Sequence, residues 1–410
     1  MVSREMVLYA PQASMINWEP RFVTPWKGPA VATSTIPPFR AEHIGSLLRP
    51  PELLALARDH AAGKISQDEL QRAQDGAIER AIDLQLALGL SSITDGEYRR
   101  HAYSDSFTVD VFSGVKISST EDLNWTYSDA DGQKTEGRVP VVVDRLEWPG
   151  PVNVSNYEFV AAASPAGTPK MTLPGPCYIH FRSGRDNISR DVYPNLDEFW
   201  QDLIAAYVEE IQALHDAGCR YIQLDETSIA KLGDPKIRAG LENRGDDWET
   251  LLEVYTDVIN AIVEQSPADM SLGMHLCRGN KGGSWQAAAG YDDVAAALFR
   301  KLAVKFYFLE YDSPRAGGFE PLREVPDDKT IILGLVSTKV AALEERSAVL
   351  RRLEEAAIYV DMDRLGLSPQ CGFASLDVGN ALSPDDQAAK LRLVVDIAKE
   401  VWNYSPAASD

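Results

Sequence analysis

The residues best suited to chemistry in this sequence are a histidine and a cysteine two positions apart, His275 and Cys277. Residues 270–274 before them are apolar enough to form a buried strand. Side chains at positions i and i+2 of a strand point to the same face, so the imidazole and the thiol should project together. Nitrogen and thiolate ligands suit a soft or borderline metal ion. A complete site needs further ligands, because this pair alone is a weak metal signal.

The missing ligands are expected at the ends of other strands. Cys371 lies in a glycine-containing turn at one such end, and Glu310 ends the strand that follows the strand of His275 and Cys277. One histidine, two cysteines and one carboxylate make a tetrahedral set for Zn²⁺. Mg²⁺ and Ca²⁺ prefer oxygen ligands, so the two thiolates argue against them.

Other acidic and thiol side chains compete for these positions. On residue type alone the carboxylate could equally be Glu97 or Asp225, and Glu310 is favoured because its strand is the next one along the sheet. Cys177 follows a Gly-Pro pair in the third strand and could line the pocket without binding metal. Cys219 lies between a helix and the strand after it, at the opposite end of the sheet, which is typical of a core thiol.

Strands and helices alternate along most of the sequence. Strands are predicted at residues 41–46, 91–97, 170–181, 220–226, 271–277, 305–312, 330–337 and 365–372. Helices are predicted at residues 66–88, 196–217, 248–264, 291–302, 343–357 and 384–401. This alternation predicts an α/β fold with a parallel sheet. Eight strands favour a single closed (β/α)₈ TIM barrel over a doubly wound sheet.

The barrel is predicted to span residues 39–404, after an irregular extension at 1–38 and before a tail at 405–410. Within it, residues 104–165 carry alternating apolar runs with Gly and Asp-Gly punctuation, which predict an antiparallel β excursion after the second strand. Chemistry in such a barrel lies at the C-terminal ends of the strands, where the four candidate metal ligands fall.

Polar residues at the other strand ends predict a binding site for an amino acid. Glu97 and Asp225 could receive an ammonium group, although each could instead only satisfy a nearby arginine. The segment Ile44-Gly45-Ser46 offers backbone N–H groups and a hydroxyl to a carboxylate.

Three more polar residues complete the candidate substrate-binding set. His43 ends the first strand, beside the segment that follows it. Arg278 and Asn280 come directly after the candidate metal ligands and could anchor an anionic substrate.

Composition limits the classes of protein and partner. The 410 residues are 45% hydrophobic and 25% charged, as in globular proteins with a large core. The net charge of −21 argues against nucleic-acid and anionic-membrane partners. We find no apolar run of transmembrane length and no secretory signal. Four cysteines in so long a chain indicate reduced thiols and a cytoplasmic location rather than a disulfide framework.

Taken together, these residues resemble the catalytic C-terminal barrel of cobalamin-independent methionine synthase, in the superfamily that also holds uroporphyrinogen decarboxylase. The resemblance covers about residues 40–403. The matching segments are Ile44-Gly45-Ser46, Gly96-Glu97, Ile222-Gln223-Leu224-Asp225-Glu226, His275-x-Cys277, Glu310 and Pro369-Gln370-Cys371-Gly372. The chain is most similar to the short, single-barrel members usually described as methionine-synthase-like. These carry runs such as His180-Phe181-Arg182 and Cys277-Arg278-Gly279-Asn280.

The resemblance implies a Zn²⁺ ion bound by His275, Cys277, Glu310 and Cys371. It implies a small thiol acceptor such as homocysteine, whose amino-acid head is bound by Ser46, Glu97 and Asp225. It also implies a methyl donor, a folate or another molecule. A thiol bound to zinc becomes a thiolate that can attack the methyl carbon. We take Asp225 and Glu310 as the catalytic residues, and Glu310 as the ligand expected to yield to the incoming sulfur.

The chain departs from the family pattern at three points. Full-length members have an N-terminal barrel that helps to bind polyglutamated folate, and here only a short segment precedes residue 39. The family's histidine after strand seven, thought to protonate the pterin leaving group, has no match in residues 334–339. His43 stands where the family usually has a small polar residue.

The leading functional prediction is therefore a zinc-dependent methyltransferase that methylates a thiol such as homocysteine. The alternative is a zinc-dependent alkyl transferase that adds a thiol to a non-folate electrophile such as an epoxide. A decarboxylase like the porphyrinogen enzymes is disfavoured by the complete His/Cys/Glu/Cys set, and a zinc-storing or degenerate barrel is the non-enzymatic reading. A homo-oligomer is compatible with the sequence.

Overall fold

The computed structural model of this protein describes residues 36–108, 112–118, 126–128, 134–136, 139–377 and 379–406. All of them belong to one unit, Val31–Asp410. Most of the extension predicted at residues 1–38 and of the tail predicted at residues 405–410 lies outside the described residues. The two domain boundaries therefore stay predictions.

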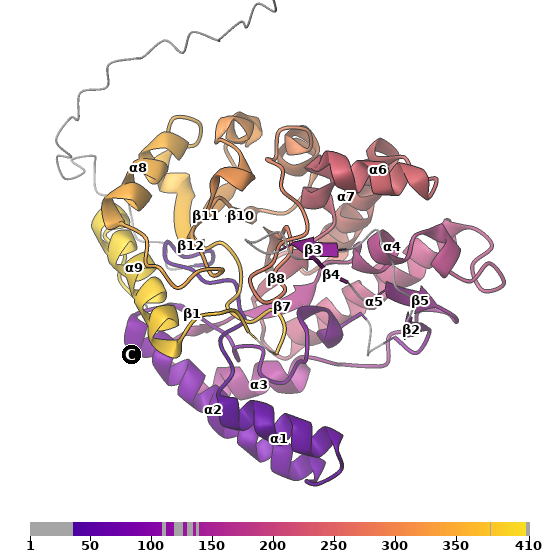
Figure 1. Ribbon diagram of the computed structural model, residues 1–410, viewed down its shortest axis with the longest axis horizontal. Coiled ribbons are helices and arrows are strands. Elements are labelled where there is room, and N and C mark those ends of the chain that lie inside the picture. The colour runs from indigo at the N-terminus through magenta and orange to yellow at the C-terminus, as the bar shows by residue number, and fades with distance from the viewer. Residues whose placement is uncertain are drawn as a thin grey trace, which may run out of the picture. The chain divides into compact units, whose positions relative to one another are not determined.

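A sheet of six parallel strands forms the centre of this unit (Figure 1). Its order is β12-β11-β10-β9-β8-β7, so strands that follow one another in sequence are neighbours in the sheet. The strands are β7 Met171–Pro174, β8 Tyr221–Glu226, β9 Ser271–Leu276, β10 Phe306–Glu310, β11 Thr330–Val336 and β12 Leu365–Pro369. Nearly all of their residues are buried, as in parallel sheets covered on both faces. Six of the eight predicted strands are thus confirmed.

Each edge of this sheet continues into a shorter pairing. At one edge, β6 (Thr168–Pro169) comes directly before β7 and pairs in parallel with β1 (Ser92–Ile93). At the other edge, Ala41 bridges to Leu367 of β12. The strand pairing of the described residues shows an α/β fold with a parallel sheet. It does not show a closed eight-stranded barrel, so the predicted closure is not confirmed.

The first predicted strand, at residues 41–46, is paired only at its first residue. The carbonyl groups of residues 43–45 do not accept hydrogen bonds from a neighbouring strand. They accept them instead from three buried side chains: Lys170, Gln223 and Thr94. Hydrogen bonds from side chains therefore take the place of the backbone hydrogen bonds that a strand at residues 41–46 would make with a neighbouring strand.

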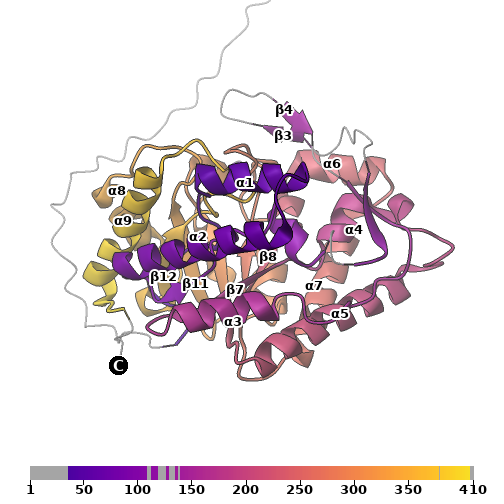
Figure 2. The ribbon, with the colours of Figure 1, turned by 90° about the horizontal axis from the view of Figure 1, so that it is seen from below.

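Nine α-helices lie in the described residues, and the longer ones pack outside the parallel strands (Figures 1 and 2). They are α1 Pro51–Ala61, α2 Gln67–Leu88, α3 Val154–Ala163, α4 Tyr178–Ser183, α5 Leu196–Asp216, α6 Pro235–Asn243, α7 Trp248–Gln265, α8 Arg346–Ala356 and α9 Pro384–Trp402. Capping boxes at Ser66 and Ser383 fix the starts of α2 and α9.

Two predicted elements differ from the observed ones. The strand predicted at 170–181 ends at Pro174, and α4 begins after the Gly-Pro pair, because proline cannot donate to a ladder. The helix predicted at 291–302 is only a short π-helix, Ala296–Lys301. Tyr291 lies before it, and its hydroxyl accepts a hydrogen bond from Glu310 N at 2.9 Å, so a tertiary contact holds this end of the segment.

The antiparallel excursion predicted after the second strand is present among the described residues. β2 (Val115–Ser118) pairs with β5 (Val139–Val142), and β3 (Thr126–Ser128) pairs with β4 (Lys134–Glu136). Both pairs are antiparallel. The predicted range 104–165 also contains helix α3, which the alternating pattern does not predict.

A fully buried carboxylate, that of Glu42, joins the first segment to the sheet. It accepts hydrogen bonds from Ser92 Oγ at 2.7 Å, Tyr221 Oη at 2.7 Å and Lys170 Nζ at 3.2 Å. Phe39 N donates to it as well, at 3.0 Å. Four donors satisfy this buried charge, as burial of a carboxylate requires.

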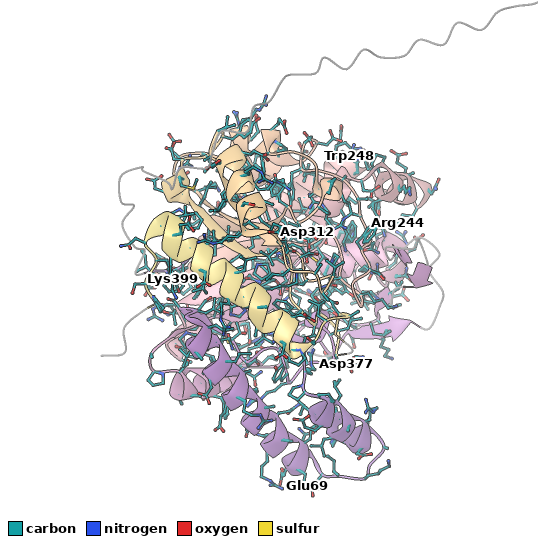
Figure 3. The ribbon with its side chains drawn as sticks, turned by 60° about the vertical axis from the view of Figure 1, so that its left-hand side comes forward. Glu69, Arg244, Trp248, Asp312, Asp377 and Lys399 are labelled. Atoms are coloured by element: carbon teal, nitrogen blue, oxygen red, sulfur yellow. The ribbon has the colours of Figure 1, made fainter. Side chains whose placement is uncertain are left out.

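Charged side chains lie both on the outer helices and in the interior. Figure 3 shows Glu69 on α2 and Lys399 on α9, whereas Asp312 is partly buried in the loop after β10. No helix in the described ranges is long and apolar enough to cross a membrane.

Candidate functional site

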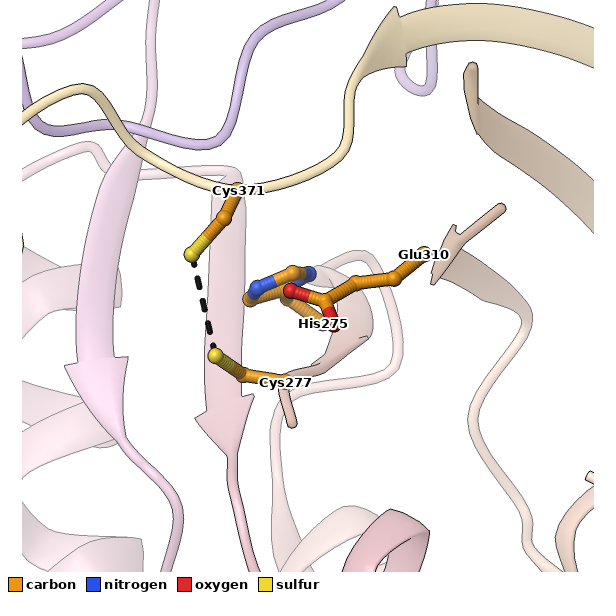
Figure 4. Close-up of side chains that lie close together, drawn as sticks. All are labelled: His275, Cys277, Glu310 and Cys371. Carbon is orange, nitrogen blue, oxygen red and sulfur yellow. Dashed lines mark hydrogen bonds between the residues drawn. The ribbon is translucent and has the colours of Figure 1, made fainter. Parts of the chain in front are cut away.

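The four predicted metal ligands come together in one buried cluster (Figure 4). One ligand atom from each of them lies within 4.8 Å of the others: His275, Cys277, Glu310 and Cys371. All four side chains are buried. The sequence placed these residues at strand ends, and the fold brings those ends to one point.

Three of the ligands are positioned by neighbouring strands. His275 belongs to β9, Cys277 directly follows it, and Glu310 is the last residue of β10. The pairing of Leu309 with Leu276 fixes the register that brings Glu310 beside the pair. Cys371 reaches the cluster from the loop after β12, at the far edge of the same sheet.

The arrangement fits a tetrahedral metal ion. The sulfurs of Cys277 and Cys371 lie 3.6 Å apart, and two Zn–S bonds of 2.3 Å at a tetrahedral angle would place them about 3.8 Å apart. Both thiols are free. Both ring nitrogens of His275 are buried and have no hydrogen-bond partner in the described part of the chain. Such orphaned buried atoms need a partner, and a metal ion supplies one.

The two thiols do not share a proton equally. Interaction with Cys277 and with the His275 ring lowers the pKa of Cys371 well below its usual range, although burial opposes this. Interaction with Cys371, together with burial, raises the pKa of Cys277. Burial disfavours the charged imidazole of His275, but Cys371 and nearby carboxylates hold its pKa above the ordinary value. One thiolate is therefore already favoured in this cluster.

The carboxylate of Glu310 is held from behind. Gln370 Nε2 donates to Oε1 at 3.0 Å, and the backbone N of Arg278 donates to Oε2 at 3.2 Å. The guanidinium of Arg278 donates to Glu310 O at 3.0 Å and stacks on the ring of Tyr291 at 4.0 Å. Arg278 thus contacts Glu310 on the side away from the cavity. It does not line the cavity, so the prediction that it anchors a substrate there is not supported.

A cavity of about 440 Å³ adjoins the cluster. Its walls include His275, Cys277 and Cys371, but not Glu310. They also include five of the predicted substrate-binding residues: Ile44, Ser46, Glu97, Asp225 and Asn280. A small molecule in this cavity would therefore contact candidate metal ligands and polar recognition groups at once.

Glu97 is held in a strained conformation at the cavity wall. Its φ is +62°, which is unusual for a residue other than glycine, and its N–H donates to Asp95 Oδ1 at 2.8 Å. Its Oε1 accepts from Thr172 Oγ1 at 3.0 Å. Gly45 has no side chain to collide with that oxygen, because a Cβ there would lie 2.8 Å from it. Arg100 forms an ion pair with Glu97 at 3.6 Å. The alternative prediction, that Glu97 pairs with a nearby arginine, is therefore confirmed.

Asp225 is the second acidic residue of the wall. Burial raises its pKa to about 7, the nearby Glu97 carboxylate adds to the shift, and the imidazole of His275 opposes it. Gln223 Nε2 donates to it at 2.7 Å. A carboxyl group of this kind is only partly ionised near neutral pH, so a cation in the cavity would favour its charged form.

Two other predicted residues help to shape the wall or lie behind it. Asn280 lines the cavity, and its Nδ2 donates to Gly372 O at 2.9 Å. His43 is buried outside the cavity wall, with Nε2 3.2 Å from Ser92 O. Cys177 and Cys219 also lie outside the metal cluster, and their thiols contact backbone oxygens of Tyr255 and Tyr221.

Sequence reasoning missed part of the wall. The residues concerned are contributed by the segments that follow β1, β7 and β8: Tyr103, Tyr178, Arg182, Thr227 and Lys231. A systematic reading of the turns after each strand would have included them, because those turns frame the site in barrel enzymes.

The fold and the cluster define a class of protein before any relative is considered. It is an α/β protein with a histidine, a carboxylate and two thiols gathered at the C-terminal ends of parallel strands. Residues 39–400 match the family described as "Cobalamin-independent synthase, Catalytic domain". The chain belongs to the cobalamin-independent methionine synthase family, whose members are methyltransferases, as the resemblance predicted.

Individual relatives agree with this assignment. The chain is 38% identical over 366 residues to the uncharacterized protein YxjH of Bacillus subtilis, covering 89% of this chain and 95% of that protein. It is 25% identical to the methionine synthase of Saccharolobus solfataricus, covering 84% and 90% of the two chains. A solved structure, the putative vitamin-B12-independent methionine synthase of Listeria monocytogenes, matches with a TM-score of 0.68 and 32% identity over 90% of this chain and 99% of that one.

Proposed function

We propose that this protein is a zinc-dependent methyltransferase that transfers a methyl group to a small thiol such as homocysteine. The observation that carries the proposal is the buried cluster of one imidazole, one carboxylate and two thiols beside a cavity lined by Ser46, Glu97 and Asp225. Family membership supports the transfer of a methyl group, and the cluster supports the thiol as its acceptor.

The residues that would hold Zn²⁺ are His275, Cys277, Glu310 and Cys371. When bound, the ion would lower the pKa of a thiol placed beside it, so that the sulfur is nucleophilic at neutral pH. Gln370 and Arg278 would orient the Glu310 carboxylate through the hydrogen bonds described above. We also propose that the protein works in the reducing environment of the cytoplasm, which the four free thiols support.

The wall residues would bind the amino-acid head of the acceptor. Glu97 and Asp225 present carboxylates to an ammonium group, and Ser46 lies beside them on the same wall. In the reaction, the acceptor sulfur forms a bond to the methyl carbon as the bond between the methyl group and the donor breaks. The thiol proton is released, and the leaving atom of the donor gains a proton. The chain's contribution is to hold the two molecules in line in a cavity shielded from water.

The donor is the less constrained half of the reaction. The segment after β11 offers no imidazole that could protonate a leaving group. Its polar groups are used internally: Ser337 Oγ donates to Asp312, Thr338 Oγ1 donates to Gln370, and Lys339 Nζ donates to Gly279 O. This observation weakens the case for a folate donor, so the second candidate is an alkyl transferase that adds a thiol to a non-folate electrophile such as an epoxide, whose ring oxygen would take its proton from water.

We also propose that the eight βα units act as a closed barrel. Between the segment at 43–47 and the segment at 92–96, contacts other than strand pairing span the remaining gap. Thr94 Oγ1 donates to Gly45 O at 2.8 Å, and Leu47 N donates to Gly96 O at 3.1 Å. These contacts support closure without making a ladder.

Metal content tests the site. We expect the purified wild-type protein to hold one equivalent of zinc, and Cys277→Ser and Cys371→Ser to lose most of it. Cys219→Ser is the matched control, because this thiol is equally buried but contacts only the Tyr221 backbone oxygen. Full zinc in both cluster variants, measured by elemental analysis, would refute the ligand assignment.

Product analysis tests the reaction. Zinc-loaded protein should form methionine from homocysteine with methyl-tetrahydrofolate or with a methylated corrinoid. If neither donor yields methionine while an epoxide yields a thioether, the second candidate function replaces the first. The Cys371→Ser variant should be inactive with every donor, which separates the protein's own activity from a contaminant's.

A further inference from the structure

Lys231 is a buried lysine whose ammonium group faces the cavity. It lies in a 3₁₀ helix, Ile229–Gly233, which follows β8, and its side chain lines the cavity wall. Only 2% of the residue is exposed. Its Nζ has no hydrogen bond or ion pair to any described residue, and it lies 5.6 Å from the centre of the Phe181 ring. A charge on so buried a side chain, with no oxygen partner from the protein, favours binding of an anion from the cavity.

The other buried lysines of the described chain all have oxygen partners. Lys170 Nζ pairs with Glu42, Lys390 Nζ pairs with Glu344 at 3.0 Å, and Lys329 Nζ donates to backbone oxygens. Each of these cations is neutralised or solvated by the protein itself. Lys231 differs from them in that it lines the cavity and has no oxygen partner among the described residues, so a molecule in the cavity can supply one.

A second cation lies close to Lys231. Arg182, at the end of α4, is 2% exposed and lines the same cavity. Burial, together with the nearby Arg182 charge, lowers the pKa of Lys231 to about 8, although Cys277, Glu226 and Glu310 oppose the shift. An anion bound in the cavity near both groups would reduce the repulsion between these two cations.

We propose that Lys231 and Arg182 form an anion subsite that binds an oxyanion group, a carboxylate or a phosphate, carried by the methyl donor. This inference rests on the proposed function for the identity of the donor, but not for the existence of the subsite. The acceptor would use other residues of the lining, namely Ile44, Ser46, Glu97 and Asp225. The subsite lies on the segments that follow β7 and β8.

The charge of the whole protein makes such a subsite useful. A net charge of −21 repels anions at long range, so an anionic donor gains nothing from general attraction. Local cations are therefore needed to hold it. An ammonium and a guanidinium form stronger hydrogen bonds to an oxyanion than neutral donors would. The donor's charged group would thereby set the direction in which its methyl carbon faces the cluster.

Anion binding is tested without any methyl transfer. The unfolding midpoint of the zinc-loaded protein is measured against phosphate and against acetate, with chloride at equal ionic strength as the reference. We expect a saturable rise for wild type and for Lys231→Arg, and none for Lys231→Met. Lys301→Met, an exposed lysine elsewhere, is the control for loss of one positive charge. The probe that half-saturates the effect at the lower concentration, acetate or phosphate, shows whether the subsite prefers a carboxylate or a phosphate.

The kinetic test asks which substrate carries the anion. With a donor that supports transfer, Lys231→Met should raise the KM for the donor by about 10- to 100-fold, the worth of a charged hydrogen bond. The KM for homocysteine should stay within about twofold, and Lys231→Arg should restore most of the donor affinity. A rise confined to the homocysteine KM would overturn the proposal.

The two failures can be told apart. If Lys231→Met keeps the same saturable stabilisation as wild type, or wild type shows none, the anion subsite is refuted whatever the enzyme does. If no donor supports transfer but the stabilisation depends on Lys231, the proposed reaction fails and the subsite stands on its own.

Discussion

The hydroxyl of Ser46 occupies the space that a side chain at Gly372 would need. A Cβ on Gly372 would lie 1.9 Å from Ser46 Oγ. The same hydroxyl accepts a hydrogen bond from Ala374 N at 3.3 Å, and Phe373 N donates to Ser46 O at 3.0 Å. The acceptor-binding segment and the loop that carries Cys371 are therefore packed as one unit.

The first prediction follows from this contact. Gly372→Ala should destabilise the protein by about 1–3 kcal/mol through overpacking. It should also lower kcat/KM, because Ser46 and the neighbouring Cys371 must both shift. Gly240→Ala is the control: its added Cβ meets nothing within 4 Å in helix α6. That variant should be neutral or slightly more stable. Chemical denaturation and homocysteine methylation measure the two effects, and an unchanged Gly372→Ala enzyme would contradict the packing argument.

A second prediction concerns Gln370, which positions Glu310. Its Nε2 donates to Glu310 Oε1, and its own Oε1 accepts from Thr338 N at 3.0 Å and Oγ1 at 2.6 Å. Gln370→Leu should weaken zinc binding by about 10- to 100-fold, as expected when a group that orients a metal ligand is lost. Competition with a chelator measures the affinity.

The matched control for Gln370 is Gln85, another fully buried amide. It exchanges hydrogen bonds with Thr94 and donates to Ala81 O. Gln85→Leu loses a similar number of buried hydrogen bonds, so it should be destabilised to a similar degree. It should nevertheless bind zinc like wild type. Equal losses of zinc affinity in the two variants would mean that general destabilisation is the cause.

A third prediction concerns recognition of the acceptor. If Glu97 binds its ammonium group, the wild-type enzyme should prefer homocysteine to 4-mercaptobutanoate, which lacks only that group. In Glu97→Gln this preference should shrink by about 10- to 100-fold, the range for a hydrogen bond to a charged group. Glu79→Gln, on the exposed face of α2, should keep it. The ratio of the two kcat/KM values is the measurement, and an unchanged ratio in Glu97→Gln would place the ammonium elsewhere.

A fourth prediction is a loss of stability in acid caused by His180. Burial, and to a lesser extent the charges of Arg244 and Arg185, lower the pKa of this imidazole to about 3. In the unfolded chain it titrates near 6.5, so between pH 6.5 and 3 the unfolded state binds the extra proton. Its contribution to stability is therefore complete above pH 6.5 and is lost as pH falls, by about 1.4 kcal/mol per pH unit.

The measurement is the free energy of unfolding between pH 4 and 7. In His180→Gln the free energy of unfolding should change less with pH, by the amount that corresponds to the uptake of about one proton. Tyr255→Phe is the control, because it removes the hydroxyl that contacts His180 Nδ1 at 2.9 Å but keeps the titrating ring. That variant should be less stable at every pH with the wild-type slope. A wild-type slope in His180→Gln would show that other groups cause the acid sensitivity.

The sequence predicts the cluster of His275, Cys277, Glu310 and Cys371 well because the order of the strands and the alternation of side chains along them position most of it. His275 and Cys277 share a strand face by alternation, and Glu310 lies on the next strand of the sheet. Cys371 was predicted because it ends the last strand, although 94 positions separate it from Cys277. Arg278 was expected in the cavity, but it follows Cys277 by one position and its side chain is directed to the opposite side, toward Glu310.

The rest of the cavity depends on tertiary contacts that no local pattern encodes. Arg182 and Lys231 belong to short helices whose positions follow from where β7 and β8 end. His43 is turned away from the cavity by its contact with Ser92. The segment at 41–46 has the sequence of a strand, yet side chains and not a neighbouring strand satisfy most of its carbonyl groups.

The buried carboxylate of Glu42 also decides where this protein can be shortened. Its charge balances Lys170, and Phe39 N is one of its donors. A chain that began after residue 42 would keep Lys170 but lose its counter-ion, at a cost of about 3–5 kcal/mol for a broken buried pair. The smallest portion able to fold should therefore begin at or before Phe39, which is also where the match to the family begins.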